Sequence, residues 1–375
     1  MIPTRDAAIE RLHHFLPRAG AKYASHRNFD HGPSDRSNIS MLSPYLRHRL
    51  ITEEEVTKAV LEEHSARNAE KFLQEVAWRT YWKGWLEMRP AVWADYQSDL
   101  LSLPRDRAYQ QAIEGRSGID CFDAWTRELI TEGYLHNHTR MWFASIWIFT
   151  LRLPWQLGAD FFMQHLMDAD PASNTLSWRW VAGLHTPGKH YLARAWNIEK
   201  FTLGRFNPTG QLNESAAALP LDRSYERETL TIAENPRLSG RVGLLISPDD
   251  LSPAPAELGL IASTAILKPD DPTPFLKGAI LDTQQRLGAE LLEGNHSAAL
   301  ANWIAREKID HIVCARPTIG PWRDLAENLG HPIQYFVSSW DRTLWPKATA
   351  GFFKLKKSLP DLHRSLCEKT QPELF

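Results

Sequence analysis

The chain has 375 residues, 43% of them hydrophobic and 23% charged, and a formal net charge of −2 at pH 7. This length predicts two domains, and the charge excludes a surface that is basic throughout, although a local basic groove remains compatible with it. No apolar run is long enough to span a bilayer and the start lacks the apolar core of a secretory signal, so no membrane association is expected. Cys121, Cys314 and Cys367 are far apart and show no metal-binding spacing, which indicates a reducing cytoplasm and no metal site.

Tryptophan is unusually frequent, with 15 residues, most of them in the first half of the chain. A large aromatic core explains many of them. The alternative is that some stack on a planar ligand or carry electrons. Composition alone leaves both explanations open.

Residues 1 to about 205 show helical patterns. A capping box, Thr52 with Glu55, opens a helix that runs to about His64. Apolar positions recur at helical spacing over 69–88. Residues 140–153 are apolar nearly all round and predict a buried central helix.

After this region the chain becomes polar and rich in proline and glycine over 207–240, which indicates a linker with at most one short helix. Short apolar runs then alternate with helical patterns, which predicts βαβ units and a doubly wound α/β domain over 241–375. The expected strands are 241–247, 310–316 and 333–339, and the expected helices are 273–288, 297–308 and 322–330. No Gly-rich phosphate-binding motif is present, so these residues alone do not predict a nucleotide site.

Polar and aromatic residues gather in a few short motifs of the helical half. The stretch 168–180, DADPASNTLSWRW, brings together two carboxylates, an amide and two indoles. Helical spacing places Asn137 and Arg140 on one face. Ser40 and Ser43 stand at a helix start, where backbone N–H groups can hold an anion. Each motif alone also fits packing, capping or a structural Arg140–Asp168 pair, so a functional interpretation depends on their joint occurrence.

The motifs SMLSPYL, LQEVAWRTYW, GYLHNHTRM and MDADPASNTLSWRW together resemble the flavin-binding helical domain of the photolyase/cryptochrome family. The similarity runs from about Tyr23 to Phe206, with similar spacing between motifs. It implies a mostly α FAD-binding helical bundle over 1–206, the linker 207–240 and a C-terminal Rossmann-like α/β domain over 241–375.

The resemblance also implies which residues hold FAD. Those expected at the phosphates and the ribityl chain are Tyr23, Ser40, Leu42, Ser43 and Arg79. Those expected around the isoalloxazine are Asn137, Arg140, Asp168, Asp170 and, facing the central ring nitrogen, Asn174. An Arg–Asp pair beside a flavin would offset charge as the ring is reduced.

The activity implied is that of a deoxyribodipyrimidine photolyase, in which light-excited reduced flavin passes an electron to a cyclobutane pyrimidine dimer, the ring splits and the electron returns. The flipped dimer would stack between Trp78 and Trp180, Glu75 would hydrogen-bond its carbonyl edge, and Met141 would contact the bases. The partner would be damaged DNA, single-stranded or duplex, and a monomer is expected. The alternatives are a cryptochrome-like blue-light photoreceptor that signals through a partner and a flavoprotein without a light function.

Three positions favour repair of cyclobutane dimers. Asn174 is the residue typical of photolyases where several cryptochromes carry another. Asn137 and Met141 stand where enzymes for the (6-4) photoproduct carry histidines. His138 is adjacent and is expected either to face the groove or to be solvated.

The sequence departs from the family in its electron chain and in its domain order. Trp178 and Trp155 match the inner and middle members of the usual tryptophan chain, but the outer position is Ala112, one helical turn after Tyr109, which could substitute. The antenna-type α/β domain stands last rather than first. Whether it binds a second chromophore or only holds one rim of a DNA groove stays open. Candidates for a basic lip that contacts phosphates, or for an ordinary solvated run, are Arg179, Lys189, Arg194 and Lys200.

Overall fold

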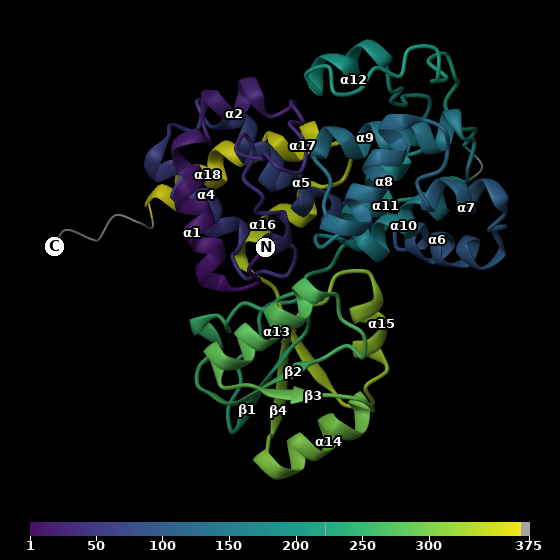
Figure 1. Cartoon of the computed structure of the whole chain (residues 1–375). Coiled ribbons are helices and arrows are strands. Elements are labelled where there is room, and N and C mark those ends of the chain that lie inside the picture. The colour runs from purple at the N-terminus through teal and green to yellow at the C-terminus, as the bar shows by residue number, and fades with distance from the viewer. Residues whose placement is uncertain (222, 369–375) are drawn as a thin grey trace. The chain divides into compact units, whose positions relative to one another are not determined.

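The computed structural model describes residues 1–221 and 223–368, and their contacts form two compact units (Figure 1). We call Met1–Pro17, Leu42–Met88 and Glu228–Phe375 the sheet unit, and Arg18–Met41 and Arg89–Arg227 the helical unit. Each unit therefore consists of segments that are far apart in the sequence.

The helical unit is built around buried tryptophans. Trp142, Trp147 and Trp178, on three neighbouring elements, are each at most 2% exposed. The predicted buried helix over 140–153 is confirmed as apolar core, but it is regular only to Ser145 and continues as a π-helical turn. The elements of this unit are α2 (Ala21–His26), α6 (Ala91–Ser102), α7 (Arg107–Ile113), α8 (Asp120–Glu132), α9 (Asn137–Ser145), η2 (Ile146–Thr150), α10 (Trp155–His165), α11 (Pro171–Ala182) and α12 (Ala195–Phe201).

The sheet unit combines helices from both ends of the chain, which lie side by side as purple and yellow ribbons in Figure 1. The predicted capping box is confirmed: Thr52 Oγ1 accepts from the Glu55 backbone N–H at 3.2 Å, and Glu55 accepts from the Thr52 N–H at 2.8 Å. The long helices of this group are α1 (Arg5–Phe15), α4 (Glu53–Glu63), α5 (Glu70–Glu87) and α18 (Leu359–Glu368). The short ones are α3 (Ser43–Arg47), α16 (Ser339–Leu344), η4 (Trp345–Lys347) and α17 (Phe352–Lys356).

The sheet is parallel throughout, with strand order β3-β2-β1-β4-β5. This order confirms the predicted doubly wound α/β fold. The strands are β1 (Val242–Ile246), β2 (Ile261–Leu267), β3 (Glu290–Leu292), β4 (His311–Ala315) and β5 (Ile333–Phe336), and the helices between them include α13 (Pro274–Leu287), α14 (His296–Glu307) and α15 (Pro321–Glu327). The sequence prediction missed β2 and β3, because β2 carries polar Ser263 and Thr264 in its middle and β3 has only 3 residues.

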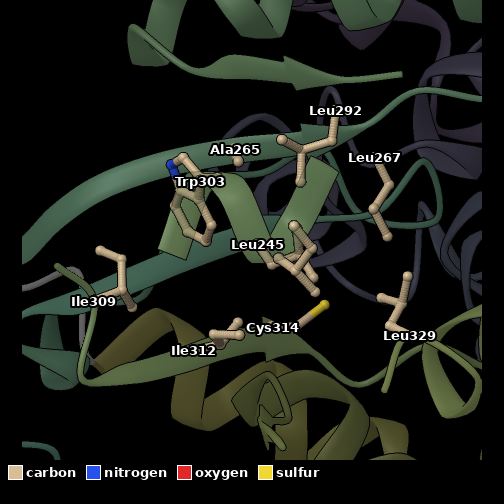
Figure 2. Close-up of a cluster of buried hydrophobic side chains, with 10 residues drawn as sticks. Leu245, Ala265, Leu267, Leu292, Trp303, Ile309, Ile312, Cys314 and Leu329 are labelled. Atoms are coloured by element: carbon tan, nitrogen blue, oxygen red, sulfur yellow. The ribbon is translucent and has the colours of Figure 1, made fainter. Parts of the chain in front are cut away.

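A continuous apolar cluster lies against this sheet, with Trp303 of α14 packed among strand residues (Figure 2). Trp303 is fully buried, and its indole N–H donates to Ser263 Oγ at 3.1 Å. A Cβ at Gly243 of β1 would collide with the Trp303 ring, so the glycine lets the indole lie directly on the strand. The other members of the cluster are Leu245, Ala265, Leu267, Leu292, Leu300, Ile309, Ile312, Cys314 and Leu329.

The segments that make up the two units do not coincide with the predicted ranges 1–206, 207–240 and 241–375. Helices α1, α3, α4 and α5 group with the sheet rather than with the other helices. One reason is a contact between α5 and the C-terminal helices: the Trp340 indole N–H donates to the buried Thr80 Oγ1 at 2.8 Å. The expected linker has no helix or strand in its described residues, and one of the boundaries between the units, at 227/228, falls inside it.

The close approach of α5 and η4 generates a prediction about Gly84. A Cβ at this position would stand 2.7 Å from the Trp345 Cα, which is backbone and cannot rotate away. We expect Gly84→Ala to lower the free energy of unfolding by about 1–3 kcal/mol, measured by urea denaturation. Gly351→Ala is the matched control, because its φ of −61° suits alanine and no atom lies within 4 Å of the position that its Cβ would take. Equal stability of the two variants would contradict the close contact.

Candidate functional site

In the helical unit, an ion pair joins the start of α9 to the loop before α11. Arg140 donates to Asp168 Oδ2 at 3.0 Å, and the Asp168 side chain is 2% exposed. Burial alone would lower the pKa of Arg140, but the charge of Asp168 raises it above the ordinary value. The pair brings together two of the residues predicted around the isoalloxazine and keeps a fixed positive charge there.

Asp170 and Asn174 stand on the first turns of α11. Asp170 is the N-cap and accepts from the Ser173 backbone N–H at 2.7 Å, and the Asn174 amide donates to the Ala159 carbonyl at 2.8 Å. Both side chains are buried. The carboxylate at the helix start complements the helix dipole, so part of its role is structural.

Several polar atoms of α11 are buried without a hydrogen-bond partner among the described residues. They are the hydroxyls of Ser173 and Thr175 and the indole N–H of Trp178. Buried polar groups are nearly always satisfied in proteins, so such a group of atoms favours a polar ligand or ordered water beside α11. The donor set therefore fits a cofactor with many hydrogen-bonding atoms. Sequence reasoning missed Ser173 and Thr175, because a serine or threonine in a helix gives no signal of its own.

Trp178 is held by aromatic neighbours and by one glycine. Its ring lies edge-on to Phe162 at 5.1 Å and to Trp147 at 6.1 Å between centroids. A Cβ at Gly158 of α10 would overlap the Trp178 ring. The position of the indole thus depends on the absence of a side chain at residue 158.

The aromatic contacts of Trp178 lead toward Tyr109. Trp147 contacts Trp178, and the Tyr109 ring lies edge-on to Trp147 at 6.0 Å. Trp155 instead stacks on Tyr96 at 5.6 Å. The electron-transfer roles of Trp178, Trp155 and Tyr109 stay predictions, and Trp147 is an additional ring that the sequence analysis did not single out.

Residues expected on the substrate side of the helical unit differ in exposure. Asn137 begins α9 and is exposed, whereas Met141 is half-buried. Trp180 is half-buried and stacks on Tyr191 with centroids 6.0 Å apart. His138 is half-buried, with its ring nitrogen 3.0 Å from the Asn28 carbonyl oxygen, so it is not a freely solvated side chain. Tyr23 of α2 and Ser40, in the loop before α3, are half-buried.

In the sheet unit, α5 presents Glu75, Trp78 and Arg79, which are all half-buried. Phe352 of α17 covers one face of the Trp78 ring, with centroids 3.9 Å apart and planes 12° from parallel. Leu42 is buried, and Ser43 begins α3 with a buried hydroxyl that lacks a hydrogen-bond partner in the described part of the chain. That hydroxyl is consistent with the predicted phosphate contact. Phe352 was missed, because a contact across most of the chain leaves no local signal.

The loop that follows β1, at the switch point of the sheet, contacts an early segment of the chain. Ligands of doubly wound sheets bind at the carboxyl ends of the strands where the order reverses, here β1 and β4. Residues 47–49 contact the loop after β1: Arg47 pairs with Asp249 at 2.8 Å, the His48 ring nitrogen lies 2.7 Å from the Pro248 carbonyl oxygen, and the His48 carbonyl accepts from the Leu251 N–H at 2.9 Å. A second chromophore in this domain stays a prediction without assigned residues.

A cavity of about 550 Å³ lies in the helical unit, lined in part by Trp155, Arg179 and Tyr225. The Arg179 guanidinium is over both rings, 5.7 Å from the Trp155 centroid and 5.1 Å from that of Tyr225. Arg179 is 6% exposed, so its prediction as a solvent-facing member of a basic lip is wrong, because it turns into this aromatic cavity. The other candidates of the lip, Lys189, Arg194 and Lys200, are exposed.

Residues 72–214 match the family model described as the FAD binding domain of DNA photolyase. Over this region the chain is similar to the photolyase/cryptochrome family. The matched region contains α5, α9 and α11, which carry most of the predicted site residues, and FAD is the cofactor of this domain. Tyr23, Ser40, Leu42 and Ser43 precede it.

Curated relatives include a deoxyribodipyrimidine photo-lyase of a Synechococcus strain, 34% identical over 64% of this chain and 49% of the relative. Another, from Alkalihalophilus pseudofirmus, is 31% identical over 50% of this chain and 39% of the relative. The chain thus spans less than half the length of these relatives. Among solved structures, a bacterial class III photolyase from Agrobacterium tumefaciens has 29% identity and a TM-score of 0.45, and the similarity covers 53% of this chain and 42% of that one.

None of the helices in the described part of the chain combines the length and the apolar character needed to cross a membrane. Among residues 1–221 and 223–368, no group of at least 3 histidine, cysteine or acidic side chains is arranged to hold a metal ion.

The overlap at Gly158 generates a prediction. We expect Gly158→Ala to displace the Trp178 indole and to lower the free energy of unfolding by about 1–3 kcal/mol, measured by urea denaturation. A double mutant cycle is the control: adding Trp178→Phe, which shortens the ring, should recover part of the loss. Strictly additive effects of the two changes would contradict the contact.

His48 generates a prediction about pH. Its pKa lies at about 3, because burial and then the charge of Arg47 disfavour the protonated ring. The unfolded chain has the ordinary value of about 6.5, so between these values the unfolded state binds a proton that the folded state does not. Above about pH 6.5 the His48 ring is neutral in both states, and its full contribution to the free energy of unfolding is present. As the pH falls from there toward about 3, this contribution decreases by at most ~1.4 kcal/mol per pH unit.

We expect His48→Gln, which keeps a donor for the Pro248 carbonyl, to flatten the fall in unfolding free energy over this pH range. The measurement is urea denaturation at several pH values. The same substitution at the exposed His14 of α1 is the control and should leave the wild-type profile. An unchanged profile in His48→Gln would show that carboxylates alone govern the acid range.

Proposed function

We propose that this chain is a light-driven, FAD-dependent enzyme that splits cyclobutane pyrimidine dimers in DNA. The observation that carries the proposal is the arrangement on α5, within the matched FAD-binding region. Trp78 is held flat by Phe352 on one face and remains half-exposed, and Glu75 precedes it by one helical turn. An aromatic platform beside a carboxyl group suits a flipped base with a polar edge.

The cofactor would be held by the residues whose chemistry fits it. Bound FAD, when reduced, supplies the electron that light excites. Arg140 keeps a positive charge near the ring because Asp168 holds it in place, and Asn174 offers an amide that can donate or accept. The phosphates and ribityl chain are assigned to Tyr23, Ser40, Leu42, Ser43 and Arg79, and Asp170 and Asn137 complete the ring contacts.

The substrate roles are proposed residue by residue. Trp78 stacks on the flipped dimer, and Glu75 hydrogen-bonds the carbonyl edge of the dimer and shares a proton there. Trp180 supplies a second aromatic wall, while Asn137 and Met141 contact the bases. Support comes from the photo-lyase names of the relatives and from the half-exposed state of Trp78, Trp180 and Met141.

The test is repair of oligonucleotides that contain one cyclobutane dimer, single-stranded and duplex, under blue light with the flavin fully reduced. We expect wild type to restore them. Trp78→Ala should bind dimer roughly fivefold to a hundredfold more weakly, because stacking on one base is worth ~1–3 kcal/mol. Glu75→Ala should repair more slowly even at saturating DNA, because it removes a group that acts on the reacting base.

Trp196→Ala is the matched control, since Trp196 of α12 is 62% exposed and outside the assigned set. Failure of wild type on both substrates would contradict the enzyme and leave the cryptochrome-like photoreceptor as the better account. Repair by wild type together with wild-type behaviour of both α5 variants would retain the activity but refute the substrate assignment.

A further inference from the structure

Helix α17 has one buried and one exposed face. Phe352 and Leu355 are buried, whereas Phe353 is 72% exposed and Lys354 is exposed beside it. Lys357, the C-cap residue, is also exposed. The exposed face therefore carries one aromatic ring and two basic side chains.

The buried face fixes α17 next to Trp78. The Phe352 ring stacks on Trp78 and meets the Tyr81 ring edge-on, with centroids 5.7 Å apart. At the other end of the helix, Lys356 pairs with Glu70 at 2.8 Å. Both contacts are to α5, so the exposed face of α17 is held at a constant place beside the proposed substrate tryptophan.

The positive charge of this face is not neutralised within the described chain. Lys347, Lys354 and Lys357 are exposed and form no ion pair with any described residue. The nearby acidic residues are engaged elsewhere: Glu70 with Lys356, and Asp361 with Arg364 at 3.6 Å. An exposed phenylalanine or a free lysine is ordinary by itself. Phe353 together with Lys354 and Lys357 on α17, and with Lys347 in the preceding η4, offers the charge and stacking surface that suit a nucleic-acid strand.

We propose that α17 binds the DNA strand next to the damaged base, with Lys347, Lys354 and Lys357 on phosphates and Phe353 stacked on a neighbouring unpaired base. This inference rests on the proposed repair function and extends it to a segment outside the matched domain. A lipid surface is the less suitable partner, because the apolar residues of the adjacent α18, Leu359, Leu362 and Leu366, are buried. The face thus offers one ring rather than an apolar stripe.

The experiment measures binding of a fluorescein-labelled single-stranded oligonucleotide, with and without one dimer, in the dark over about 50 to 200 mM salt. The double variant Lys354→Ala/Lys357→Ala should weaken binding. It should also reduce the steepness of log affinity against log salt by about 1.4, because each of the two lost phosphate contacts accounts for roughly 0.7. Phe353→Ala should weaken binding roughly fivefold to a hundredfold with the slope unchanged, and Phe353→Trp should restore it. Lys277→Ala, an exposed lysine of α13, is the control.

The inference would be overturned if the lysine variant kept the wild-type affinity and slope, or if Phe353→Ala bound the oligonucleotide as tightly as wild type. In either case, dimer repair by wild type would still support the proposed function. If wild type neither binds nor repairs DNA, both proposals fail. Loss of binding to anionic phospholipid vesicles in these variants, with DNA binding intact, would assign the face to a membrane and overturn its role on DNA. All the changed side chains are exposed, so folding is expected to be retained.

Discussion

A single buried guanidinium organises the sheet unit. Arg49 is 8% exposed and pairs with three carboxylates, Asp250 at 2.9 Å, Glu53 at 3.4 Å and Asp341. Burial would lower its pKa, but the three acids raise it well above the ordinary value, so the charge is permanent. Its φ of 50° is a left-handed conformation that a non-glycine residue adopts only when its surroundings enforce it. The chain turns sharply here because the ion pairs hold the side chain in place.

The same type of interaction holds α5. Glu87 is the last residue of that helix, where a carboxylate is unfavourable for the helix dipole. It accepts from Arg323 at 2.7 Å, from Arg316 at 3.1 Å and from the Ile319 N–H at 2.9 Å, all following β4. The carboxyl edge of the sheet therefore anchors the ends of α3 and α5, the helices that carry Ser43 and Trp78. We interpret the sheet as a support for these helices.

These ion pairs join segments of the sheet unit that are far apart in the sequence. Asp249, Asp250, Arg316 and Asp341 act on the first hundred residues although they follow them by more than 200 positions, as in the Arg49–Asp250 pair with a separation of 201. Because breaking one partner of a buried pair strands the other charge, such contacts specify which segments meet even where their net stabilisation is small. Apolar contacts alone would specify less strictly which segments of the chain pair with one another.

Local chemistry in the sequence determined the elements and the chemical type of the site. The Thr52–Glu55 capping box begins α4, Gly288 ends α13 in a left-handed conformation, and the motifs that carry Arg140, Asp168 and Asn174 resemble those of a flavin-binding domain. These signals lie within a few residues or within recognisable motifs. They could not reveal β2, whose middle carries the polar residues Ser263 and Thr264, or that Arg179 turns inward over Trp155 and Tyr225.

Only the tertiary structure decided how the segments are grouped and what surrounds the predicted residues. The stack of Phe352 on Trp78, the hydrogen bond from Trp340 to Thr80 over a separation of 260 and the contact of residues 47–49 with the loop after β1 all join distant parts of the chain. Helical and strand periods describe which face of an element is apolar, but they carry no information about which distant side chain covers it. Shape, stacking and charge pairing in the folded chain supply that choice.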